Sequence, residues 1–420
     1  MTIKGKLSTE AYKGVRDFYP EDEAVQKYLF STMRKAVEKF GYVEYHASIL
    51  EPAELYRGKT SEEIVNEQTY TFVDRGEREV TLRPEMTPTV ARLVAAKRRE
   101  LAFPVRWYSI PNVFRYERPQ RGRLREHWQL NVDLFGSGSI VADAEIISVA
   151  YAVMKAFGAA DSDFEIRVGS RAYLNAIIEK TGLSKEHGKK LLGLFDRREK
   201  MPAETFDAAL QELGVSPDAF SSASVPEDAH ELLSLLEQMG VENTHFDERV
   251  VRGFEYYTGI VFEVFDKHPE NNRSLFGGGR YDNLLQLFGE EQVPAVGFGM
   301  GDVTMRDFLA VRGLIPPYVS PTKVYLAVAS DDATLDAMKI AAELRTRGVN
   351  TAVDFGDKKL GDQIRVADKQ KIPYLIVVGR DEIESGQFAV RDMTTRTEKM
   401  FSRADLGEFF LNLENGETGK

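Results

Sequence analysis

The stretch FRYERPQRGRLREHWQLNVDLFG, at residues 114–136, has the pattern of two strands joined by a polar loop. Pro119 and Gly122 break any helix at its centre, and five arginines lie from Arg115 to Arg125. The flanking segments WYSIPNVF and HWQLNVDLF are rich in β-branched and aromatic residues, as strands are. The stretch therefore predicts a hairpin with arginines at its tip, and arginine is well suited to binding phosphate.

The second strand of this hairpin alternates polar and apolar side chains. Its polar residues are Gln129, Asn131 and Asp133, and leucine or valine stands between them. Because alternate residues of a strand share a face, one face of the sheet carries a row of polar groups, and Arg115 and Glu117 project together for the same reason. Such a row favours a binding site. A solvated charge cluster is the alternative for the arginines.

A second informative stretch is RGFEYYTG, at residues 252–259. The flanks ERVV and IVFEVF indicate that it enters or forms a strand. On a strand, Tyr256 and Tyr257 point to opposite faces, so that one lines a pocket and the other supports its wall. Arg252 beside two aromatic hydroxyls suits a small polar ligand with developing negative charge. A hairpin with a surface arginine and half-buried tyrosines is the alternative.

Together these stretches resemble the class II aminoacyl-tRNA synthetases. FRYERPQRGRLREHWQL is similar to motif 2 of that class, and RGFEYYTG followed by GGGRYDNLL at Gly277–Leu285 resembles the motif pair typical of histidyl-tRNA synthetases. Three further segments are similar to the amino-terminal signature, motif 1 and the substrate loop of that family. They are KGVRDFYP at Lys13–Pro20, GYVEYHASILEPAELY at Gly41–Tyr56 and TLRPEMTPTVAR at Thr81–Arg92.

The resemblance implies that histidine and ATP form histidyl adenylate and pyrophosphate, and that histidine then passes to its tRNA. Arg115 would bridge the α-phosphate and the substrate carboxylate, and Arg252 would stabilise the charge that develops there, so both are expected to be catalytic. Mg²⁺ is expected on the phosphates, with phosphate and water oxygens as most of its ligands.

The resemblance also implies three groups of binding residues. Those expected to bind ATP are Arg115, Glu117, Arg123 and His127, the histidine standing where the family often stacks an aromatic ring on adenine. Those expected to bind histidine are Glu85, Met86, Thr87, Arg115, Gln129, Asp133, Arg252, Tyr256 and Tyr257. Those expected to contact the acceptor end of the tRNA are Arg118, Gln120, Arg121 and Arg125. Weaker candidates for the anticodon arm are Lys358, Lys359 and Arg365.

Specificity for histidine would rest on a polar pocket. Neutral imidazole offers one donor and one acceptor, and a pocket that pairs both rejects analogues that lack them. By resemblance, Glu85 and Thr87 bind the amino group, and the two adjacent tyrosines meet the imidazole ring. Gln129 and Asp133 stand at positions that hold the amino group and the pocket floor.

One segment departs from the family pattern. AVGFGMGDVTMRDFLA, at residues 295–310, resembles motif 3, whose helix normally carries an arginine over the adenine. Counted without a gap, Thr304 holds that position, and Arg306 lies roughly on the opposite helix face. Either another cation replaces the missing one, or the ATP clamp is weaker, or activation is impaired. We expect an active enzyme with a raised Michaelis constant for ATP.

Two other functions fit parts of the pattern. A paralogue of this family lacks synthetase activity and is the regulatory subunit of ATP phosphoribosyltransferase in histidine biosynthesis. The intact arginine-rich hairpin and the C-terminal domain count against that function. A class II synthetase for glycine, proline or threonine would share the C-terminal domain but not RGFEYYTG with GGGRYDNLL.

Composition narrows the class of protein further. The chain has no cysteine, which excludes disulfides and thiolate zinc sites, and its six histidines lack the spacing of metal ligands. The net charge of −11 argues against indiscriminate coating of nucleic acid, so an RNA would be held by local basic patches. No apolar run is long enough to span a bilayer and no secretory signal is evident, so a soluble, cytoplasmic protein is expected.

The expected architecture is an α+β catalytic domain with an antiparallel sheet at residues 1–318, interrupted by a helical insertion at about 170–240. A proline-punctuated linker at 314–322 leads to an α/β domain at 323–415 that resembles the anticodon-binding domain of class II synthetases. Alternation of strands and helices there predicts a mostly parallel sheet. Motif 1 forms a two-fold interface in this family, so a homodimer is expected.

Overall fold

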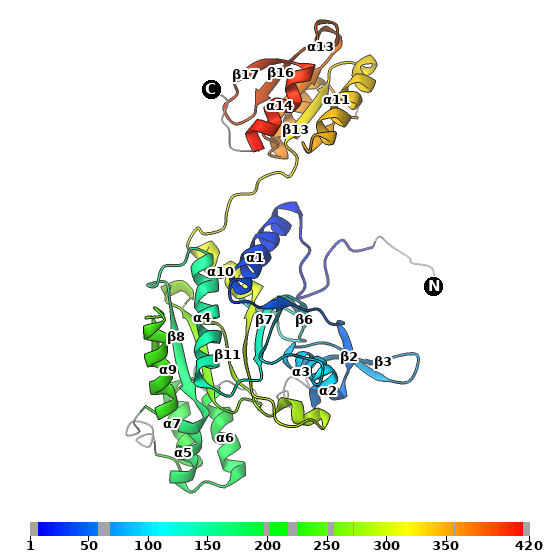
Figure 1. The fold of residues 1–420 in the computed structure, drawn as a ribbon. Coiled ribbons are helices and arrows are strands. Elements are labelled where there is room, and N and C mark those ends of the chain that lie inside the picture. The colour runs from blue at the N-terminus through cyan, green and yellow to red at the C-terminus, as the bar shows by residue number, and fades with distance from the viewer. Residues whose placement is uncertain are drawn as a thin grey trace. The chain divides into compact units, whose positions relative to one another are not determined.

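The computed structural model describes residues 7–57, 68–196, 201–216, 225–250, 256–271, 273–355 and 358–414. The chain divides into two compact units, Met1–Pro316 and Pro317–Lys420 (Figure 1). The division falls between consecutive prolines of the segment LIPPYVSPT, which cannot continue a helix. Each unit has its own hydrophobic core.

The first unit is built on a nine-stranded sheet whose order is β1-β5-β7-β12-β11-β10-β8-β9, with β6 also paired to β7. β1–β5 and β8–β9 are parallel pairs, and the other pairs are antiparallel, as the sequence predicts. The strands are β1 (Val43–Glu44), β5 (Val105–Ser109), β6 (Asn112–Phe114), β7 (Glu126–Phe135), β8 (Phe164–Ser170), β9 (Thr244–Phe246), β10 (Ile260–Asp266), β11 (Ser274–Arg280) and β12 (Ala295–Gly301).

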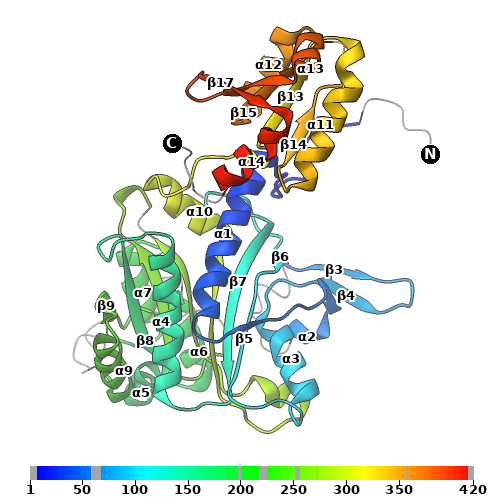
Figure 2. The same ribbon diagram turned by 45° about the horizontal axis from the view of Figure 1, so that its top comes forward.

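Four helices cover one face of this sheet (Figures 1 and 2). They are α1 (Pro20–Glu38), α4 (Ile140–Ala156), α9 (Glu227–Gln238) and α10 (Asp302–Val311). Helix α1 has proline at its first position, acidic residues in its first turn and a lysine in its last, all of which favour a helix. Its buried residues Leu29, Met33 and Val37 follow helical spacing and pack on the sheet.

The helical insertion in the chain between β8 and β10 is smaller than predicted. Helices α5 (Arg171–Thr181), α6 (Lys185–Asp196) and α7 (Ala203–Glu212) lie between β8 and β10 in the chain and share a separate small core. Helix α9, which the sequence assigned to the insertion, instead buries Ala229, Leu232 and Leu236 in the main core beside α4. The strands on either side of the module, β8 and β10, are direct neighbours in the sheet, so the sheet continues across the insertion.

The opposite face of the sheet is only partly covered. Helix α3 (Thr87–Lys97) and the 3₁₀ helix η4 (Leu284–Phe288) pack there and share a core with Val261 and Phe135. Beside them lie helix α2 (Glu54–Arg57) and a three-stranded sheet of order β2-β4-β3, built from β2 (Leu50–Pro52), β4 (Glu79–Leu82) and β3 (Tyr70–Val73). The 3₁₀ helix η3 (Pro269–Asn271) connects β10 to β11.

The second unit is an α/β domain with five strands in the order β14-β13-β15-β16-β17. The first three strands are parallel, but β16 and β17 add an antiparallel hairpin, so only half of the strand pairs are parallel. Its strands are β13 (Val324–Val328), β14 (Thr351–Val353), β15 (Tyr374–Val378), β16 (Gln387–Asp392) and β17 (Glu398–Ser402). Its helices are η5 (Asp331–Ala333), α11 (Thr334–Thr346), α12 (Leu360–Lys369), α13 (Arg380–Ser385) and α14 (Arg403–Glu414).

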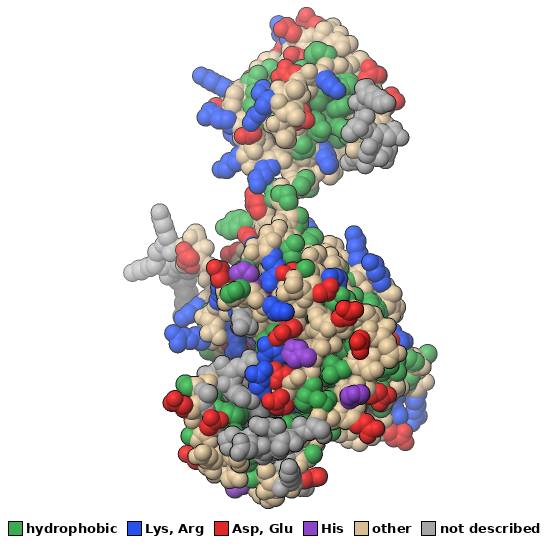
Figure 3. Space-filling model, turned by 90° about the vertical axis from the view of Figure 1, so that its left-hand side faces the viewer, with side chains coloured by type: hydrophobic (Ala, Val, Ile, Leu, Met, Phe, Trp, Pro, Cys, Tyr) green, Lys and Arg blue, Asp and Glu red, His purple; other side chains and the backbone are tan. Residues whose placement is uncertain are grey.

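One face of the molecule carries side chains of both charges beside hydrophobic ones. On the face shown in Figure 3, lysine and arginine side chains are interspersed with aspartate and glutamate. Among the described residues, no helix is both long enough and apolar enough to cross a membrane.

Candidate functional site

The uncovered face of the large sheet forms the floor of a cavity of about 640 Å³. Strands β7, β10, β11 and β12 supply the floor, and α10 and the loop at 115–125 supply walls. Twelve residues predicted for the site line this cavity together: Glu85, Thr87, Arg115, Glu117, Gln120, Arg121, Arg123, His127, Gln129, Asp133, Tyr256 and Tyr257.

Glycines on β12 make room for the polar row on β7. The two strands are antiparallel, and Gly297 and Gly299 pair with Asp133 and Asn131. A Cβ atom on Gly299 would lie 2.1 Å from Gln129 Nε2, and one on Gly297 would lie 2.5 Å from Asp133 Oδ1. Only glycine leaves space for these side chains above the sheet. The alternating glycines of AVGFGMG were a sequence signal for this floor that the motif analysis did not use.

The deep end of the cavity presents two free acceptors. Gln129 Oε1 and Asp133 Oδ2 are buried and have no hydrogen-bond partner among the residues that the structure describes. The other carboxylate oxygen of Asp133 accepts a hydrogen bond from the Tyr281 hydroxyl. Burial raises the pKa of Asp133 to about 7, although that hydrogen bond acts in the opposite direction. Since buried polar groups are nearly always paired, this arrangement is typical of a pocket that receives a hydrogen-bond donor.

The two adjacent tyrosines lie on the same side, not on opposite faces as predicted. Both precede β10 in a non-strand segment, so the period-2 alternation does not apply to them. Their ring centroids are 4.8 Å apart, and both rings line the cavity. The Tyr256 hydroxyl donates to Glu85 Oε2 at 3.2 Å, which joins the substrate loop to this wall.

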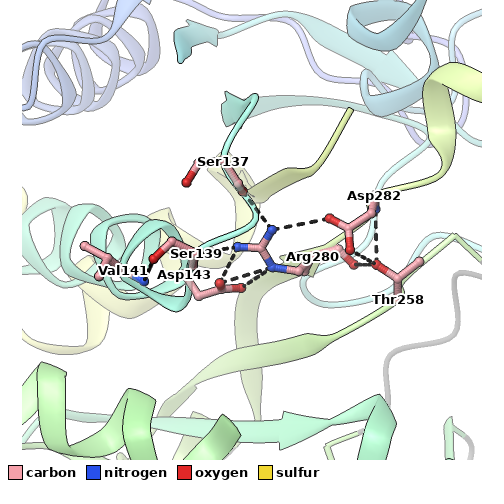
Figure 4. Close-up of polar contacts among 7 residues, drawn as sticks. All are labelled: Ser137, Ser139, Val141, Asp143, Thr258, Arg280 and Asp282. Carbon is pink, nitrogen blue, oxygen red and sulfur yellow. Dashed lines mark hydrogen bonds and ion pairs between the residues drawn. The ribbon is translucent and has the colours of Figure 1, made fainter. Parts of the chain in front are cut away.

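A buried arginine network fixes the segment behind these tyrosines (Figure 4). Arg280, of the GGGRYDNLL motif, donates to the Asp143 carboxylate and to the carbonyls of Ser137 and Ser139 at 2.9 and 3.0 Å. Its own carbonyl accepts from Thr258 N at 2.8 Å. Arg280 therefore ties the start of α4 and the end of β11 to the residue that follows Tyr257.

The loop at 115–125 forms the charged end of the cavity. Arg115 Nε donates to Pro84 O at 2.9 Å, which fixes its guanidinium beside the substrate loop. Glu117 Oε2 lies 3.8 Å from Arg123 Nη1. Burial lowers the pKa of His127 to about 3, and the charges of Arg115 and Arg16 contribute to the shift. His127 is therefore a neutral aromatic ring at physiological pH.

The amino-terminal signature packs against the start of β7, the strand that follows this loop. Arg16 Nη2 donates to Asp302 Oδ2 at 2.6 Å, and Asp302 Oδ1 accepts from Trp128 N at 2.9 Å. Gly14 O accepts from Arg125 N at 2.7 Å. KGVRDFYP thus connects motif 2 to the start of α10.

Thr304 lines the cavity, at the position where the resemblance to motif 3 predicts an arginine. Its hydroxyl donates to Leu275 O at 2.9 Å and lies 3.1 Å from Gly301 O, so backbone carbonyls use its donor. A Cβ atom on Gly301 would lie 3.8 Å from Thr304 Oγ1 and 3.9 Å from His127 Cδ2, which places these two side chains on the same part of the wall. Arg306 faces elsewhere, as predicted, and forms an ion pair with Asp22.

Some predicted site residues lie outside the cavity. Met86 is 1% exposed and does not line the cavity, which corrects its assignment to histidine binding. Arg125 is 9% exposed, and its guanidinium lies 3.9 Å from the centre of the Tyr116 ring, so the structure does not support a tRNA contact there. Arg118 is exposed and outside the cavity. Arg252 lies outside the described residues.

The cavity also contains residues that motif analysis missed. They are Asp247, Arg249, Glu263, Arg273 and Tyr281. Tyr281 belongs to a segment already singled out, so the motif GGGRYDNLL contained the signal. Asp247, Arg249 and Arg273 stand outside any motif, and only the fold brings them to the cavity. Asp247 is 3% exposed and binds Arg249 at 2.7 Å.

In the described ranges, no group of three or more histidine, aspartate or glutamate side chains is placed to hold a metal ion. The carboxylates Glu117 and Glu263 line the cavity as separate groups. This donor set fits a hard cation that takes most of its oxygen ligands from a substrate and from water.

Comparison with known proteins gives a consistent family. The family profile described as "Histidyl-tRNA synthetase" matches residues 14–212 and 200–301, and the profile described as "Anticodon binding domain" matches residues 323–413. A histidine–tRNA ligase of Leptospira biflexa is 42% identical over 419 residues, covering 94% of this chain and 96% of its own length. One from Thermoplasma volcanium is 37% identical over 426 residues, covering 96% of this chain and 98% of its own length.

The fold agrees with solved structures. The crystal structure of a histidyl-tRNA synthetase from Nostoc superposes with a TM-score of 0.80, at 23% identity, over 97% of this chain and 100% of that chain.

Proposed function

Because the chain belongs to the histidyl-tRNA synthetase family, we propose that it joins histidine to histidine tRNA through a histidyl adenylate. In the first step the histidine carboxylate attacks the α-phosphate of ATP and pyrophosphate leaves. In the second step a terminal hydroxyl of the tRNA attacks the acyl carbon and AMP leaves. The observation that carries the proposal is one cavity with buried unpaired acceptors at its deep end and arginines at its mouth.

The deep end of the cavity would bind histidine. Gln129 Oε1 and Asp133 Oδ2 can each accept a hydrogen bond, which suits an ammonium or an imidazole N–H. Glu85 and Thr87 would bind the amino group, and Tyr256 and Tyr257 would enclose the imidazole ring. A neutral imidazole that pairs with these groups would be preferred over isosteric apolar side chains, which would leave the acceptors buried and unpaired.

The charged end of the cavity would bind ATP. Arg115 is fixed by Pro84 O next to the histidine end, so its guanidinium could bridge the substrate carboxylate and the α-phosphate. Neutral His127 could stack on adenine, Glu117 could accept a hydrogen bond from it, and Arg123 could reach the terminal phosphates. Arg252 is proposed to share the charge on the reacting oxygens. Fixed positive groups of this kind stabilise phosphoryl transition states without reorganisation.

Mg²⁺ is proposed to accompany ATP. When bound, it would neutralise charge on the phosphate oxygens. Glu263 lines the cavity and could ligate Mg²⁺ directly or through water, and the arginines would hold the phosphates in line with the carboxylate of histidine.

Contacts with tRNA are proposed at two places. Arg118, Gln120 and Arg121 are exposed on the loop tip and could meet the acceptor end. In the second unit, Lys358 and Lys359 are exposed at the start of α12 and could meet phosphates of the anticodon arm, whereas Arg365 pairs with Asp362. The match of residues 323–413 to an anticodon-binding family supports this assignment.

A homodimer in the cytoplasm is also proposed. Val43 and Leu50, in the segment similar to motif 1, are 62% and 39% exposed, which suits an interface. The regulatory-subunit alternative has less support, because the curated relatives at 37–42% identity are named as ligases.

Exchange of labelled pyrophosphate into ATP tests the first step. We expect exchange that depends on histidine and exceeds that with any other amino acid. Exchange with none of the twenty amino acids would refute the enzymatic function. Exchange that depends on a different amino acid would refute the assignment of the deep end to histidine.

A further inference from the structure

We propose that Arg273 supplies the nucleotide-facing positive charge that α10 lacks at Thr304. This inference rests on the proposed function, because it assumes that the charged end of the cavity binds ATP. Arg273 immediately precedes β11 and lines the cavity, but no motif of the sequence includes it.

Arg273 lies next to Thr304 on the wall of the cavity. The hydrogen bond from Thr304 Oγ1 to Leu275 O fastens α10 to the start of β11, two residues from Arg273. Asp307, three residues further along α10 and thus on the same helix face as Thr304, binds Arg273 Nη2 at 2.7 Å. The Arg273 guanidinium is therefore held along the wall that Thr304 occupies, where an arginine from α10 would otherwise lie.

Arg273 also contacts the loop at 115–125, which covers the charged end of the cavity. Arg273 Nη1 donates to Arg121 O at 3.0 Å. A Cβ atom on Gly122 would lie 2.2 Å from that same Nη1, so only glycine permits this approach. Gly122 also has a φ of +78°, which other residues adopt at a cost. The guanidinium is thus fixed between the motif 2 loop and α10.

The charge of Arg273 is only partly neutralised by its neighbours. Arg273 Nε is buried, and no atom in the described part of the chain forms a hydrogen bond with it. Asp307 serves two guanidiniums, since Arg121 Nε also lies 3.7 Å from its carboxylate, so this group of three side chains keeps a net positive charge. The Arg273 side chain is 29% exposed, which leaves it accessible to a ligand.

Two other arginines near the end of the cavity that is proposed to bind ATP do not line that cavity. Arg306 forms an ion pair with Asp22, and Arg312 forms one with Asp266. Neither lines the cavity. Among the described arginines on α10, at its C-terminal end and at the start of β11, Arg273 alone faces the nucleotide end.

The test compares Arg273→Ala with Asp307→Asn and Arg306→Ala. ATP affinity is measured by calorimetric titration without histidine, and Michaelis constants are measured by pyrophosphate exchange. We expect Arg273→Ala to weaken ATP binding and raise the Michaelis constant for ATP about tenfold to a hundredfold, as for loss of a hydrogen bond to a charged group. The constant for histidine should change less than about twofold, and turnover less than the ATP constant, since a contact equal in both states is uniform binding.

The two other variants separate a ligand contact from a structural one. Asp307→Asn breaks the same ion pair but leaves the arginine in place, so it should weaken ATP binding far less than Arg273→Ala. Equal losses in these two variants would show that Arg273 acts only through the ion pair, and an unchanged ATP affinity in Arg273→Ala would overturn the proposal outright. Arg306→Ala should match wild type in ATP affinity, and a loss equal to that of Arg273→Ala would also contradict the proposal.

The titration keeps this inference distinct from the proposed function. If wild type binds ATP and Arg273→Ala does not, but no amino acid supports exchange, the inference stands and the enzymatic function fails. If exchange is normal and ATP binding by Arg273→Ala equals that of wild type, the function stands and the inference fails.

Discussion

Asp133→Asn should change how the stability of the first unit depends on pH. In the folded chain Asp133 has a pKa of about 7, compared with an ordinary value of 3.8. The folded state therefore holds a proton that the unfolded state releases, and the stability gained from the neutral carboxyl is lost as pH rises from about 4 through 7. A difference of about 3 pKa units corresponds to about 4 kcal/mol at pH 8. The asparagine side chain does not ionise, so the variant should lack this loss.

The assay is urea denaturation followed by tryptophan fluorescence between pH 5 and 8. Both tryptophans of the chain, Trp107 and Trp128, lie in the first unit, so the signal reports that unit alone. Trp107 pairs directly with Asp133 across β5 and β7. The unfolding free energy of the variant relative to wild type should rise with pH, by about 2.5 kcal/mol between pH 5 and 8.

Histidine provides the matching control. A bound donor at Asp133 Oδ2 would favour the ionised carboxylate, so histidine should stabilise wild type more at pH 8 than at pH 6 and should stabilise Asp133→Asn only weakly. A difference between the two proteins that stays constant over the pH range, with or without histidine, would refute the assignment of Asp133 as a buried, ligand-facing acid.

Further variants test other parts of the site. Gly299→Ala should raise the Michaelis constant for histidine about tenfold or more, because its Cβ would displace Gln129; overpacking of this kind costs about 1–3 kcal/mol, and an unchanged constant would mean that Gln129 does not touch substrate. Arg252→Ala should slow pyrophosphate exchange about a hundredfold, the effect of removing one preorganised charge, while histidine binding changes little. Near wild-type exchange would argue against catalysis by that arginine. Neutralising Arg118, which is exposed and lies outside the cavity, should reduce tRNA charging and its dependence on salt while adenylate formation remains, because phosphate contacts release counterions. Equal losses in both steps would place the tip on ATP.

The sequence predicted the parts of the site that follow from local regularity. The alternation of Gln129, Asn131 and Asp133 required only a strand, and the structure brings all three to the cavity. The two tyrosines were misplaced because the pattern of β10 was extended backwards over residues that lie outside the strand. The burial of Arg125 was also beyond local reasoning, since its partners Tyr12 and Gly14 come from the distant amino-terminal segment.

The remaining differences have tertiary causes. Helix α9 has the same helical spacing as α5–α7, and only its packing beside α4 separates it from the insertion. The hairpin of β16 and β17 follows a βαβ pattern that by itself predicts a parallel sheet. Arg273 belongs to no recognisable motif. Its position beside Thr304 depends on how α10 packs against the start of β11.

Charging of tRNA with labelled histidine tests the central claim most directly. Purified protein, ATP and Mg²⁺ are incubated with total tRNA, and acid-precipitable label is measured for histidine and for each of the other amino acids. We expect that histidine alone is incorporated into tRNA and that omission of ATP abolishes the incorporation. Histidine-dependent pyrophosphate exchange without any incorporation into tRNA, or incorporation of a different amino acid, would contradict it.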